Sequence, residues 1–429
     1  MAANGTGQVG FENPGFNGIH VVPQTYSGQF YIRGTYNGAI TASLVSNLTG
    51  EVFVTATLPV ISTTGNWTHV NYTLVSTVTA PTINNSLLIT FDAAKATDKS
   101  LDFNFISLFP PTYNNRPNGL RPDLMETLAG LNPSFSRLPG GSNVEGESLK
   151  IPNEGPWLWN ATVGPLIDRP GRYGAWTHYD TGGLGLDEWL DFCVDLDMTP
   201  VLGIFSGLVL DGTILNITQL QPYIQNTLDM LEYILGSTDT QYGALRAQYG
   251  HAEPWNVRYI EFGNEDNLNG GLVNYQDRYN AYYSAVKASY PDITLVADTL
   301  EIDTPVGEMK DYHDYDVPDN LVKAYNFFDQ NTTSVQTLIG EYACVYPNTA
   351  SNAVNYTAGL WHHPFWIGTV SEAGMLLSRH SPCPIQPRRA NSLPIQSFSS
   401  APSATATRSS APPTRPPSLS SSLHTGPWT

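Results

Sequence analysis

Two glutamates in the sequence have the residue type and the setting for acid and base chemistry. Glu265 lies in the segment RYIEFGNED (258–266), and Glu341 lies in GEYA (340–343). Each follows a short apolar run of the kind that forms a buried strand. Most glutamates are solvated surface residues, but catalytic groups of parallel barrels lie where strands end and loops begin. The two segments therefore predict a pair of carboxylates at strand ends.

The chemistry open to such a pair is the cleavage of a glycosidic bond. Hydrolysis through an oxocarbenium-like transition state requires two carboxylic acids, one on each side of the bond. One acid must stay protonated at working pH, through burial or a like-charged neighbour. At a separation of ~5 Å the other attacks the anomeric carbon, and the configuration is retained. Gly263 permits the turn before Glu265, and Asn264 can hydrogen-bond a sugar hydroxyl.

The first part of the chain is predicted to be an all-β module. Short runs rich in Thr, Val, Tyr and Phe alternate with turn residues, and no helical period of useful length occurs. We expect residues 1–110 to form a β-sandwich of the carbohydrate-binding type. Its candidate strands are residues 29–33, 42–45, 51–56, 87–91 and 101–106.

From about Pro110 the pattern changes to strands that alternate with helices, which is typical of a parallel sheet. We expect residues 111–378 to form a catalytic (β/α)₈ TIM barrel that lacks its first and last strands. Candidate strands are 135–138, 199–205, 257–262, 293–297, 311–315 and 335–340, and candidate helices are 120–131, 184–196, 218–235, 275–289, 319–329 and 364–377. A doubly wound sheet is the alternative, but no G-x-G-x-x-G or Walker A phosphate loop occurs.

The chain of 429 residues carries 38 acidic and 20 basic side chains, a net charge of −18. This balance argues against nucleic acid or an anionic membrane as a partner, and no apolar run approaches the ~20 residues of a membrane span. Residues 379–429 contain five arginines and no acid, so residues 1–378 carry 15 basic and 38 acidic side chains, or −23. The Ser/Pro-rich tail is expected to be disordered, and its abrupt change of charge favours a mis-translated gene end over a glycosylated linker.

Nine Asn-x-Ser/Thr sequons favour a secreted, extracellular glycoprotein. The acceptors are Asn4, Asn47, Asn66, Asn71, Asn84, Asn160, Asn216, Asn331 and Asn355. Three cysteines are too few for a disulfide framework. No apolar leader follows Met1, so either the protein is cytosolic or its natural N-terminus precedes this residue, and we expect the second.

Several motifs resemble those of the fungal α-L-arabinofuranosidases of glycoside hydrolase family 51. They are NRPNGLRPDL (115–124), SRLPGGSNVEG (136–146), VGPLIDRPGR (163–172), YDTGGLGLDEWL (179–190), RYIEFGNED (258–266) and GEYA (340–343). The similarity covers about residues 8–378. It implies a retaining, exo-acting enzyme that releases terminal arabinofuranosyl groups from arabinoxylan or arabinan and needs no cofactor or metal.

The resemblance also implies a role for individual residues. Glu265 would be the general acid/base and Glu341 the nucleophile. Asn264 would hold the 2-hydroxyl of the sugar, and His313 and Tyr315 would line the pocket near the nucleophile.

Other residues have open roles. Arg137 could hold a carboxylate at the pocket floor or form a structural ion pair. The family has an asparagine where this chain has Ser142, so Asn143 is a candidate substitute for that sugar contact. Trp157, Trp159 and Trp176 could stack on a sugar, with core packing as the alternative for each. Trp157 is our candidate among them.

The chain also departs from the family, because the similarity includes neither the first nor the eighth barrel strand. We therefore expect an incomplete gene model, truncated at both ends, whose open sheet would expose two edges. Two other functions stay open. A related endo-glucanase or xylosidase places two glutamates at the same strand ends, and a broken barrel could be inert while the sandwich binds polysaccharide.

Overall fold

A computed structural model describes residues 7–344, except 16, 99, 176–178, 269, 317 and 331–334. Several predictions lie outside the described residues. They concern Trp176, the sequons at Asn4, Asn331 and Asn355, the helix at 364–377 and the tail at 379–429.

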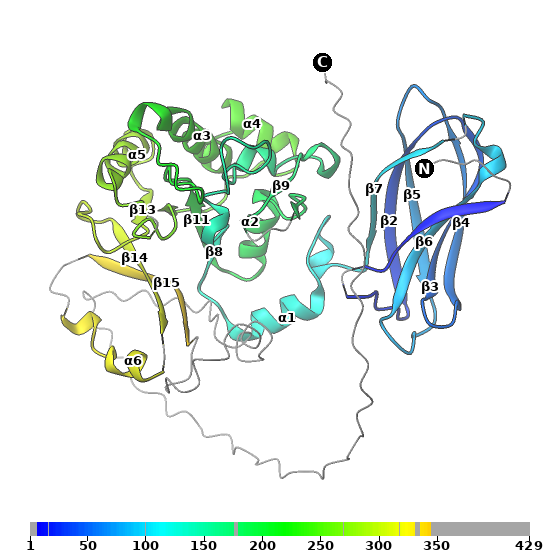
Figure 1. Ribbon diagram of the computed structural model, residues 1–429, viewed down its shortest axis with the longest axis horizontal. Coiled ribbons are helices and arrows are strands. Elements are labelled where there is room, and N and C mark those ends of the chain that lie inside the picture. Colours follow the sequence, from blue (N-terminus) through cyan, green and yellow to red (C-terminus); the bar gives the residue numbers. More distant parts are fainter. Residues whose placement is uncertain are drawn as a thin grey trace, which may run out of the picture. The chain divides into compact units, whose positions relative to one another are not determined.

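The N-terminal part consists of two antiparallel sheets, drawn in blue in Figure 1. One sheet has the order β1-β6-β3-β4 and the other the order β5-β2-β7. The strands are β1 (Gln8–Asn13), β2 (Gln24–Arg33), β3 (Tyr36–Ser46), β4 (Val52–Ser62), β5 (Thr68–Ser76), β6 (Asn85–Asp92) and β7 (Asp102–Phe109). A β-sandwich is the architecture that we predicted for this part.

The sandwich folds because alternate residues of its strands are apolar. In β2 the side chains of Phe30 and Ile32 are fully buried, while Tyr31 between them is partly exposed. Phe30 and Ile32 join Phe91 of β6 in one cluster of buried hydrophobic residues that belongs entirely to residues 21–101. This cluster is the core of the sandwich.

Six described strands after residue 111 form one parallel sheet, with the order β15-β14-β13-β12-β11-β8. They are β8 (Phe135–Leu138), β11 (Thr199–Ile204), β12 (Tyr259–Phe262), β13 (Thr294–Ala297), β14 (Met309–Asp316) and β15 (Gln336–Cys344). Spatial order equals chain order, as in a barrel, and each strand pairs with the next one along the chain. Two short strands, β9 (Arg172–Tyr173) and β10 (Tyr179–Asp180), form a separate hairpin.

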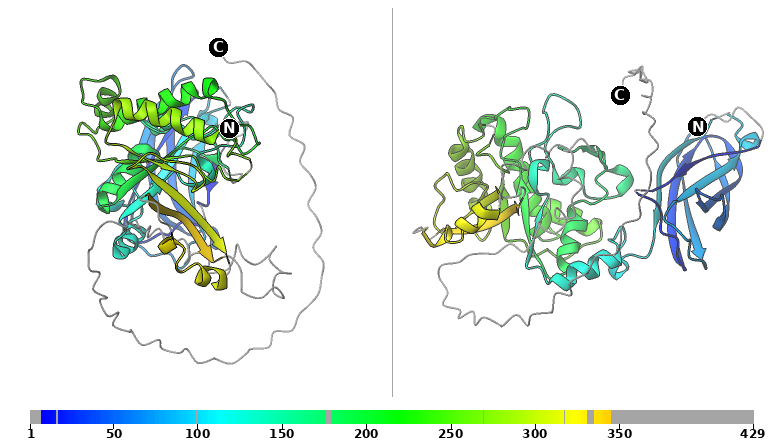
Figure 2. Two further views of the ribbon diagram at one scale, coloured as in Figure 1. Left: turned by 90° about the vertical axis from the view of Figure 1, so that its left-hand side faces the viewer. Right: turned by 60° about the horizontal axis from the view of Figure 1, so that its bottom comes forward.

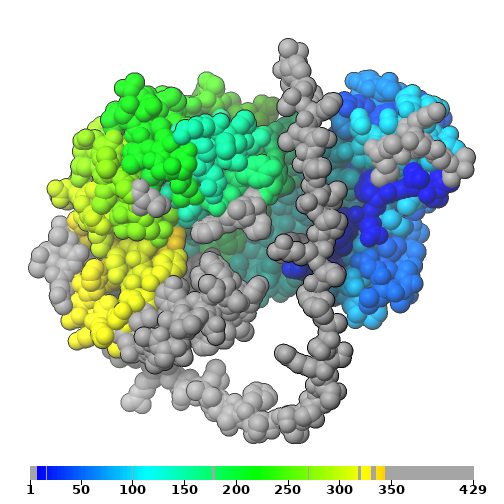
Figure 3. All heavy atoms as spheres, in the orientation of Figure 1, coloured from blue at the N-terminus to red at the C-terminus, as the bar shows by residue number. Residues whose placement is uncertain are grey.

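Among the described residues, one helix precedes β8 and the others lie between successive strands of this sheet in the chain (Figures 1 and 2). They are α1 (Pro122–Leu131), α2 (Leu186–Asp195), α3 (Ile217–Leu235), α4 (Gln241–Gln248), α5 (Tyr275–Ser289) and α6 (Pro318–Lys323). In the space-filling view, the yellow atoms of the segment that contains β14 adjoin the yellow-green atoms of the segment before it (Figure 3). Within the described residues, no helix combines the length and the apolar character that a membrane span would need.

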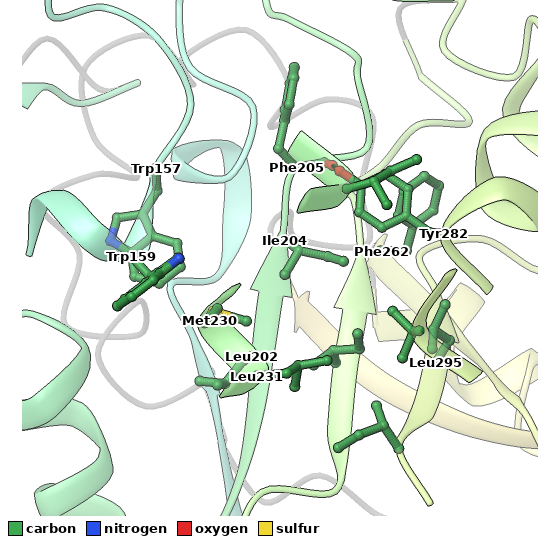
Figure 4. Close-up of a cluster of buried hydrophobic side chains, with 14 of the residues drawn as sticks. Trp157, Trp159, Leu202, Ile204, Phe205, Met230, Leu231, Phe262, Tyr282 and Leu295 are labelled. Carbon is green, nitrogen blue, oxygen red and sulfur yellow. Dashed lines mark hydrogen bonds between the residues drawn. The ribbon is translucent and has the colours of Figure 1, made fainter. Parts of the chain in front are cut away.

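The main core of this part lies between the sheet and its helices. Leu202 and Ile204 of β11 and Phe262 of β12 point into it, as does Tyr282 of α5 (Figure 4). Tyr282 also donates a hydrogen bond to the carbonyl of Phe205, at 2.9 Å. The sheet is therefore fixed to its outer layer by apolar packing and by buried phenol hydroxyls.

A second, smaller cluster occupies the opposite face of the sheet. Every one of the six strands contributes one residue to it: Phe135, Val201, Val296, Met309 and Leu338 are buried, and Tyr259 packs against them. Residues from all strands can converge in this way only if the sheet curves around them. A layer of inward side chains is the usual filling of a parallel barrel.

The curvature is confirmed by a contact between the two edge strands. Nη1 of Arg137, on β8, lies 2.6 Å from Oε1 of Glu341, on β15. In a flat sheet five strand spacings of about 4.8 Å would separate these edges by about 24 Å. The sheet is therefore rolled up far enough for one edge to reach the other.

Candidate active site

The candidate site is the layer of side chains above the inner apolar cluster. Residues two positions apart in a strand point to the same face. Two residues after Phe135, Tyr259 and Met309 come Arg137, Glu261 and Asp311, and these three charged side chains are buried. An apolar layer therefore supports a charged layer at the carboxyl ends of the strands.

Arg137 is the centre of this layer. Its Nε donates to Glu261, its Nη1 to Glu341 at 2.6 Å, and its Nη2 to Oδ1 of Asn264 at 2.9 Å. Its side chain is only 8% exposed. Burial opposes the charge of the guanidinium, but Glu261 and Asp311 outweigh burial and raise the pKa of Arg137. Both readings of Arg137 hold, because it forms a buried ion pair and also contacts a predicted catalytic carboxylate.

Glu341 lies inside β15, which extends beyond the predicted strand at 335–340. Each of its oxygens has one donor: Oε1 accepts from Arg137, and Oε2 accepts from the hydroxyl of Tyr315 at 2.5 Å. Burial would raise the pKa of Glu341, but the positive charges of His313 and Arg137 lower it below its usual value. The carboxylate is therefore ionised and oriented, as a nucleophile must be.

Glu265 follows the end of β12 by three residues, in the turn that the sequence predicted. Its Oε1 lies 3.0 Å from Nδ1 of His313, and its side chain is 29% exposed. One oxygen of Glu265 and one of Glu341 lie within 4.8 Å of each other. The structure thus brings together the two glutamates that the sequence places 76 positions apart.

His313, on β14, connects the two glutamates with the charged layer. Its Nε2 lies 2.9 Å from Oδ2 of Asp311, and its Nδ1 lies 3.0 Å from Glu265 and 3.7 Å from Glu341. Burial opposes protonation of the ring, but the hydrogen bonds to Asp311 and Glu265 raise the pKa of His313 to about 10. Both ring nitrogens are therefore protonated at neutral pH, and each can donate a hydrogen bond to a carboxyl group.

Asn264 has both ends of its amide occupied. Its oxygen accepts from Arg137, and its nitrogen donates to Oε2 of Glu145 at 3.3 Å. Glu145 is 3% exposed, and burial raises its pKa to about 7. We did not predict Glu145, although it belongs to the SNVEG segment beside the site.

The remaining predicted residues lie elsewhere or are held by other groups. Asn143 accepts a hydrogen bond from Arg172, at 3.2 Å from its side-chain oxygen. The structure favours the core-packing alternative for Trp157: this residue is 5% exposed, and its ring packs against Trp189, with ring centroids 5.2 Å apart. Trp159 is buried in the same core.

Two groups in the described residues have the geometry of cation ligands. They are Glu261 with Asp311 and His313, and Glu265 with His313 and Glu341. In both groups the carboxylates are already paired with Arg137 or His313. Each of these carboxyl groups therefore already has a protein cation as a partner, and the arrangement favours proton transfer and nucleophilic attack.

Comparisons with known proteins point to one family. The α-L-arabinofuranosidase 1 domain matches residues 127–333. α-L-Arabinofuranosidase A of Aspergillus kawachii is 45% identical over 351 residues, which are 80% of this chain and 55% of the relative. The corresponding protein of Aspergillus niger is 44% identical over the same shares. An arabinose-bound α-L-arabinofuranosidase of glycoside hydrolase family 51 superposes with a TM-score of 0.75 and 38% identity, covering 81% of this chain and 56% of that one.

The rolled parallel sheet, with two glutamates at the carboxyl ends of its strands, places the chain in the class of glycoside hydrolase barrels. Within that class it belongs to the fungal α-L-arabinofuranosidase family, in glycoside hydrolase family 51. The chain spans little more than half the length of the relatives it matches.

Proposed function

We propose that this chain is the catalytic part of a retaining, exo-acting α-L-arabinofuranosidase. The observation that carries the proposal is the separation of Glu265 and Glu341, whose nearest oxygens lie within 4.8 Å. Retaining glycosidases have carboxyl groups about 5–5.5 Å apart, while inverting enzymes need about 6.5–9.5 Å to admit a water molecule. The names of the relatives support arabinofuranosides as substrates.

The proposed reaction has two steps, and the same two residues serve both. Glu341 attacks the anomeric carbon while Glu265 gives its proton to the departing oxygen, so that an ester forms and the polysaccharide hydroxyl leaves. Glu265 then takes a proton from water, and the resulting hydroxide displaces Glu341 and releases arabinose. Arg137 and Tyr315 hold the nucleophile, and Asn264 lies beside it for the 2-hydroxyl.

The proposal includes an eight-stranded barrel, to which the six described strands belong. Their order and the convergence of six inward side chains support it. Arabinoxylan, arabinan and their oligosaccharides are the proposed substrates. Secretion is supported by the six sequons in the described residues, because the acceptor asparagines are all exposed: Asn47, Asn66, Asn71, Asn84, Asn160 and Asn216.

The test is the release of arabinose from an aryl α-L-arabinofuranoside and from arabinoxylan by the full chain. We expect the parent to release free arabinose, and Glu341→Ala and Glu265→Ala to lose at least 10³-fold in kcat on arabinoxylan. Glu232→Ala, in helix α3, serves as a matched control and should leave turnover unchanged. Release of longer oligosaccharides would instead identify an endo-acting glucanase or xylosidase.

A second function is favoured by the exposed face of the sheet β5-β2-β7. There the ring of Tyr31 stacks on His69, with centroids 4.5 Å apart and planes 9° from parallel. Arg33 lies over the ring of Trp67, which is 39% exposed. Exposed aromatic rings flanked by polar groups are suited to sugar faces, so we propose that this face binds polysaccharide.

Binding to insoluble arabinoxylan separates this second function from catalysis. Trp67→Ala and Tyr31→Ala should each weaken binding of the full chain at least fivefold while hydrolysis of an aryl arabinoside is kept. Tyr173→Ala, at an exposed aromatic residue of the β9 strand, is the control. Equal binding by all variants would exclude the proposed face.

A further inference from the structure

The turn that carries Glu265 has an uncommon backbone. Glu265 has φ 53°, and Gly263 two residues earlier has φ 92°. The left-handed region is sparsely populated by residues with a side chain. A glutamate remains there only when its surroundings determine the conformation. The question is therefore which groups impose this turn.

One buried residue, Asp298, contacts the turn directly on one side and through Tyr275 on the other. Oδ2 of Asp298, directly after β13, accepts a hydrogen bond from the backbone N–H of Asp266 at 3.1 Å. The N–H of Asp298 donates to the hydroxyl of Tyr275 at 3.0 Å, and that hydroxyl donates to the carbonyl of Phe262 at 2.8 Å. Asp298 thus connects the residue after Glu265 with the last residue of β12.

The side chain of Asp266 closes the arrangement from the other direction. Ser206 donates to its Oδ2 at 2.8 Å, and Nη2 of Arg278 lies 3.0 Å from its Oδ1. Asp266 and Arg278 are completely buried. A Cβ atom at Gly263 would collide with the carboxylates of Asp266 and Asp298, so both carboxyl groups pack directly against the Cα of this turn.

The charges of this cluster fix the protonation of its members. The guanidinium of Arg278 pairs with Asp266, and the carboxyl group of Asp298 faces that of Asp266. Burial, followed by the charge of Asp266, raises the pKa of Asp298 well above its usual value. With its proton on Oδ1, a neutral Asp298 still accepts from the backbone N–H of Asp266 through Oδ2.

We propose that Asp298 is a positioning residue for Glu265, which it reaches through the turn and without contact with the substrate. The inference rests on the proposed function and adds a residue to it. Asp298 follows Val296 of the inner apolar cluster by two positions, at the carboxyl end of β13. Without it, the turn would relax toward negative φ and the carboxyl group of Glu265 would move away from the departing oxygen.

Two substitutions separate position from charge. Asn has the shape of the Asp side chain, and its carbonyl can accept from the N–H of Asp266. Ala removes this hydrogen bond. We therefore expect Asp298→Asn to keep kcat within threefold of the parent and Asp298→Ala to lower it. Asp187→Ala, at a partly buried carboxylate bonded to Tyr233, is the matched control.

The readout is the dependence on the leaving group. A departing group that is a weak base, such as dinitrophenolate, needs no proton, whereas an alkyl alcohol does. We expect Asp298→Ala to lower kcat/KM, which reports only the first step, at least tenfold more for an alkyl arabinofuranoside than for the dinitrophenyl one. Asp187→Ala should affect both substrates equally.

Equal losses on both substrates for Asp298→Ala, or equal losses for the Asn and Ala variants, would overturn the proposal. A crystal structure of Asp298→Ala gives a measurement that is independent of activity. Glu265 should leave the left-handed region in it, and a φ still near 53° would also overturn the proposal. An inactive parent would contradict the proposed function alone, since the crystal structure still decides the role of Asp298.

Discussion

His313 carries the positive charge that lies between the two glutamates. It lies 3.0 Å from Glu265 and 3.7 Å from Glu341, and the pKa of its ring is raised to about 10. The ring is therefore an imidazolium over the whole acidic and neutral range. That charge and the guanidinium of Arg137 keep the pKa of Glu341 low against the effect of burial.

Removal of this charge should change the pH profile. In His313→Ala the pKa of Glu341 rises, because a nearby cation no longer favours the carboxylate. The acidic limb of kcat/KM, which reports ionisation of the nucleophile in the free enzyme, should therefore move to higher pH. Measurement of initial rates from pH 3 to 7 checks this. His69→Ala, at an exposed histidine of the sandwich, should leave the limb in place.

Glu145 should make stability depend on pH. Because its folded-state pKa of about 7 exceeds the usual 4.5, the folded protein retains a proton that the unfolded chain releases. Its contribution to stability is therefore complete below about pH 4.5 and is lost as pH rises through 7. Glu145→Gln mimics the neutral form, so it should raise Tm relative to the parent at pH 8 and change it little at pH 4.5.

Thermal denaturation at the two pH values measures this difference. The Gln oxygen can still accept from Asn264, so the variant should keep its activity. Glu147→Gln, two residues further along the chain, is the control for the loss of a negative charge. If the difference in Tm between the parent and Glu145→Gln is the same at pH 4.5 and pH 8, the raised pKa of Glu145 is contradicted.

At the level of elements, Arg137 joins the two edge strands of the sheet. It extends from β8 to Glu341 on β15 and pairs with Glu261 on β12 on the way. Arg137→Met would leave Glu261 buried and without its cation. Removal of one partner of a buried pair costs about 3–5 kcal/mol, so the free energy of unfolding should fall by about this amount.

Urea denaturation followed by tryptophan fluorescence measures the loss. Arg33→Met on the sandwich removes an exposed pair with Asp102 and should cost about 0–1 kcal/mol. Similar losses in the free energy of unfolding for Arg137→Met and Arg33→Met would show that Arg137 does not join the edge strands β8 and β15 structurally.

Much of this arrangement can be predicted from local sequence. The strand Phe135–Leu138 has the predicted bounds, and Glu265 follows β12 in the expected turn. The strand predictions were correct because short β-branched and aromatic runs between turn residues rarely form another secondary structure. The glutamates could be chosen because a polar residue after such a run has a definite place in a parallel sheet.

The rest depends on contacts that no local pattern contains. Helix α4 (Gln241–Gln248) was missed because it has few apolar residues to mark a buried face. The ring of Trp157 looks the same in a sequence whether it faces solvent or core, and here Trp189 covers it. Asp298 and Glu145 became identifiable only once the register of the sheet and the loops around it were known.

At the level of the whole molecule, the described residues contain separate hydrophobic cores. The sandwich core belongs to residues 21–101, and the core between the parallel sheet and its helices belongs to residues 157–302. The two clusters share no residue. Domains with their own cores can unfold in separate transitions.

Differential scanning calorimetry of Phe91→Ala tests this independence. Phe91 is fully buried in the sandwich core, and truncation of such a side chain costs about 3–5 kcal/mol. We expect one transition to move to lower temperature while the other, together with hydrolysis of an aryl arabinoside, stays unchanged. Phe262→Ala, in the core between the parallel sheet and its helices, should lower the temperature of the other transition and leave the sandwich transition unchanged. A common shift of all transitions in both variants would show that the cores unfold as one.

The contact between Arg137 and Glu341 joins residues 204 positions apart. Contacts at such a separation require a large loop to close, and they form after local contacts during folding. Helices and the sandwich can therefore be complete while the nucleophile is still far from its partner. On refolding from denaturant, recovery of the helical signal should precede recovery of hydrolysis, so the active site reports the last stage at which the chain becomes native.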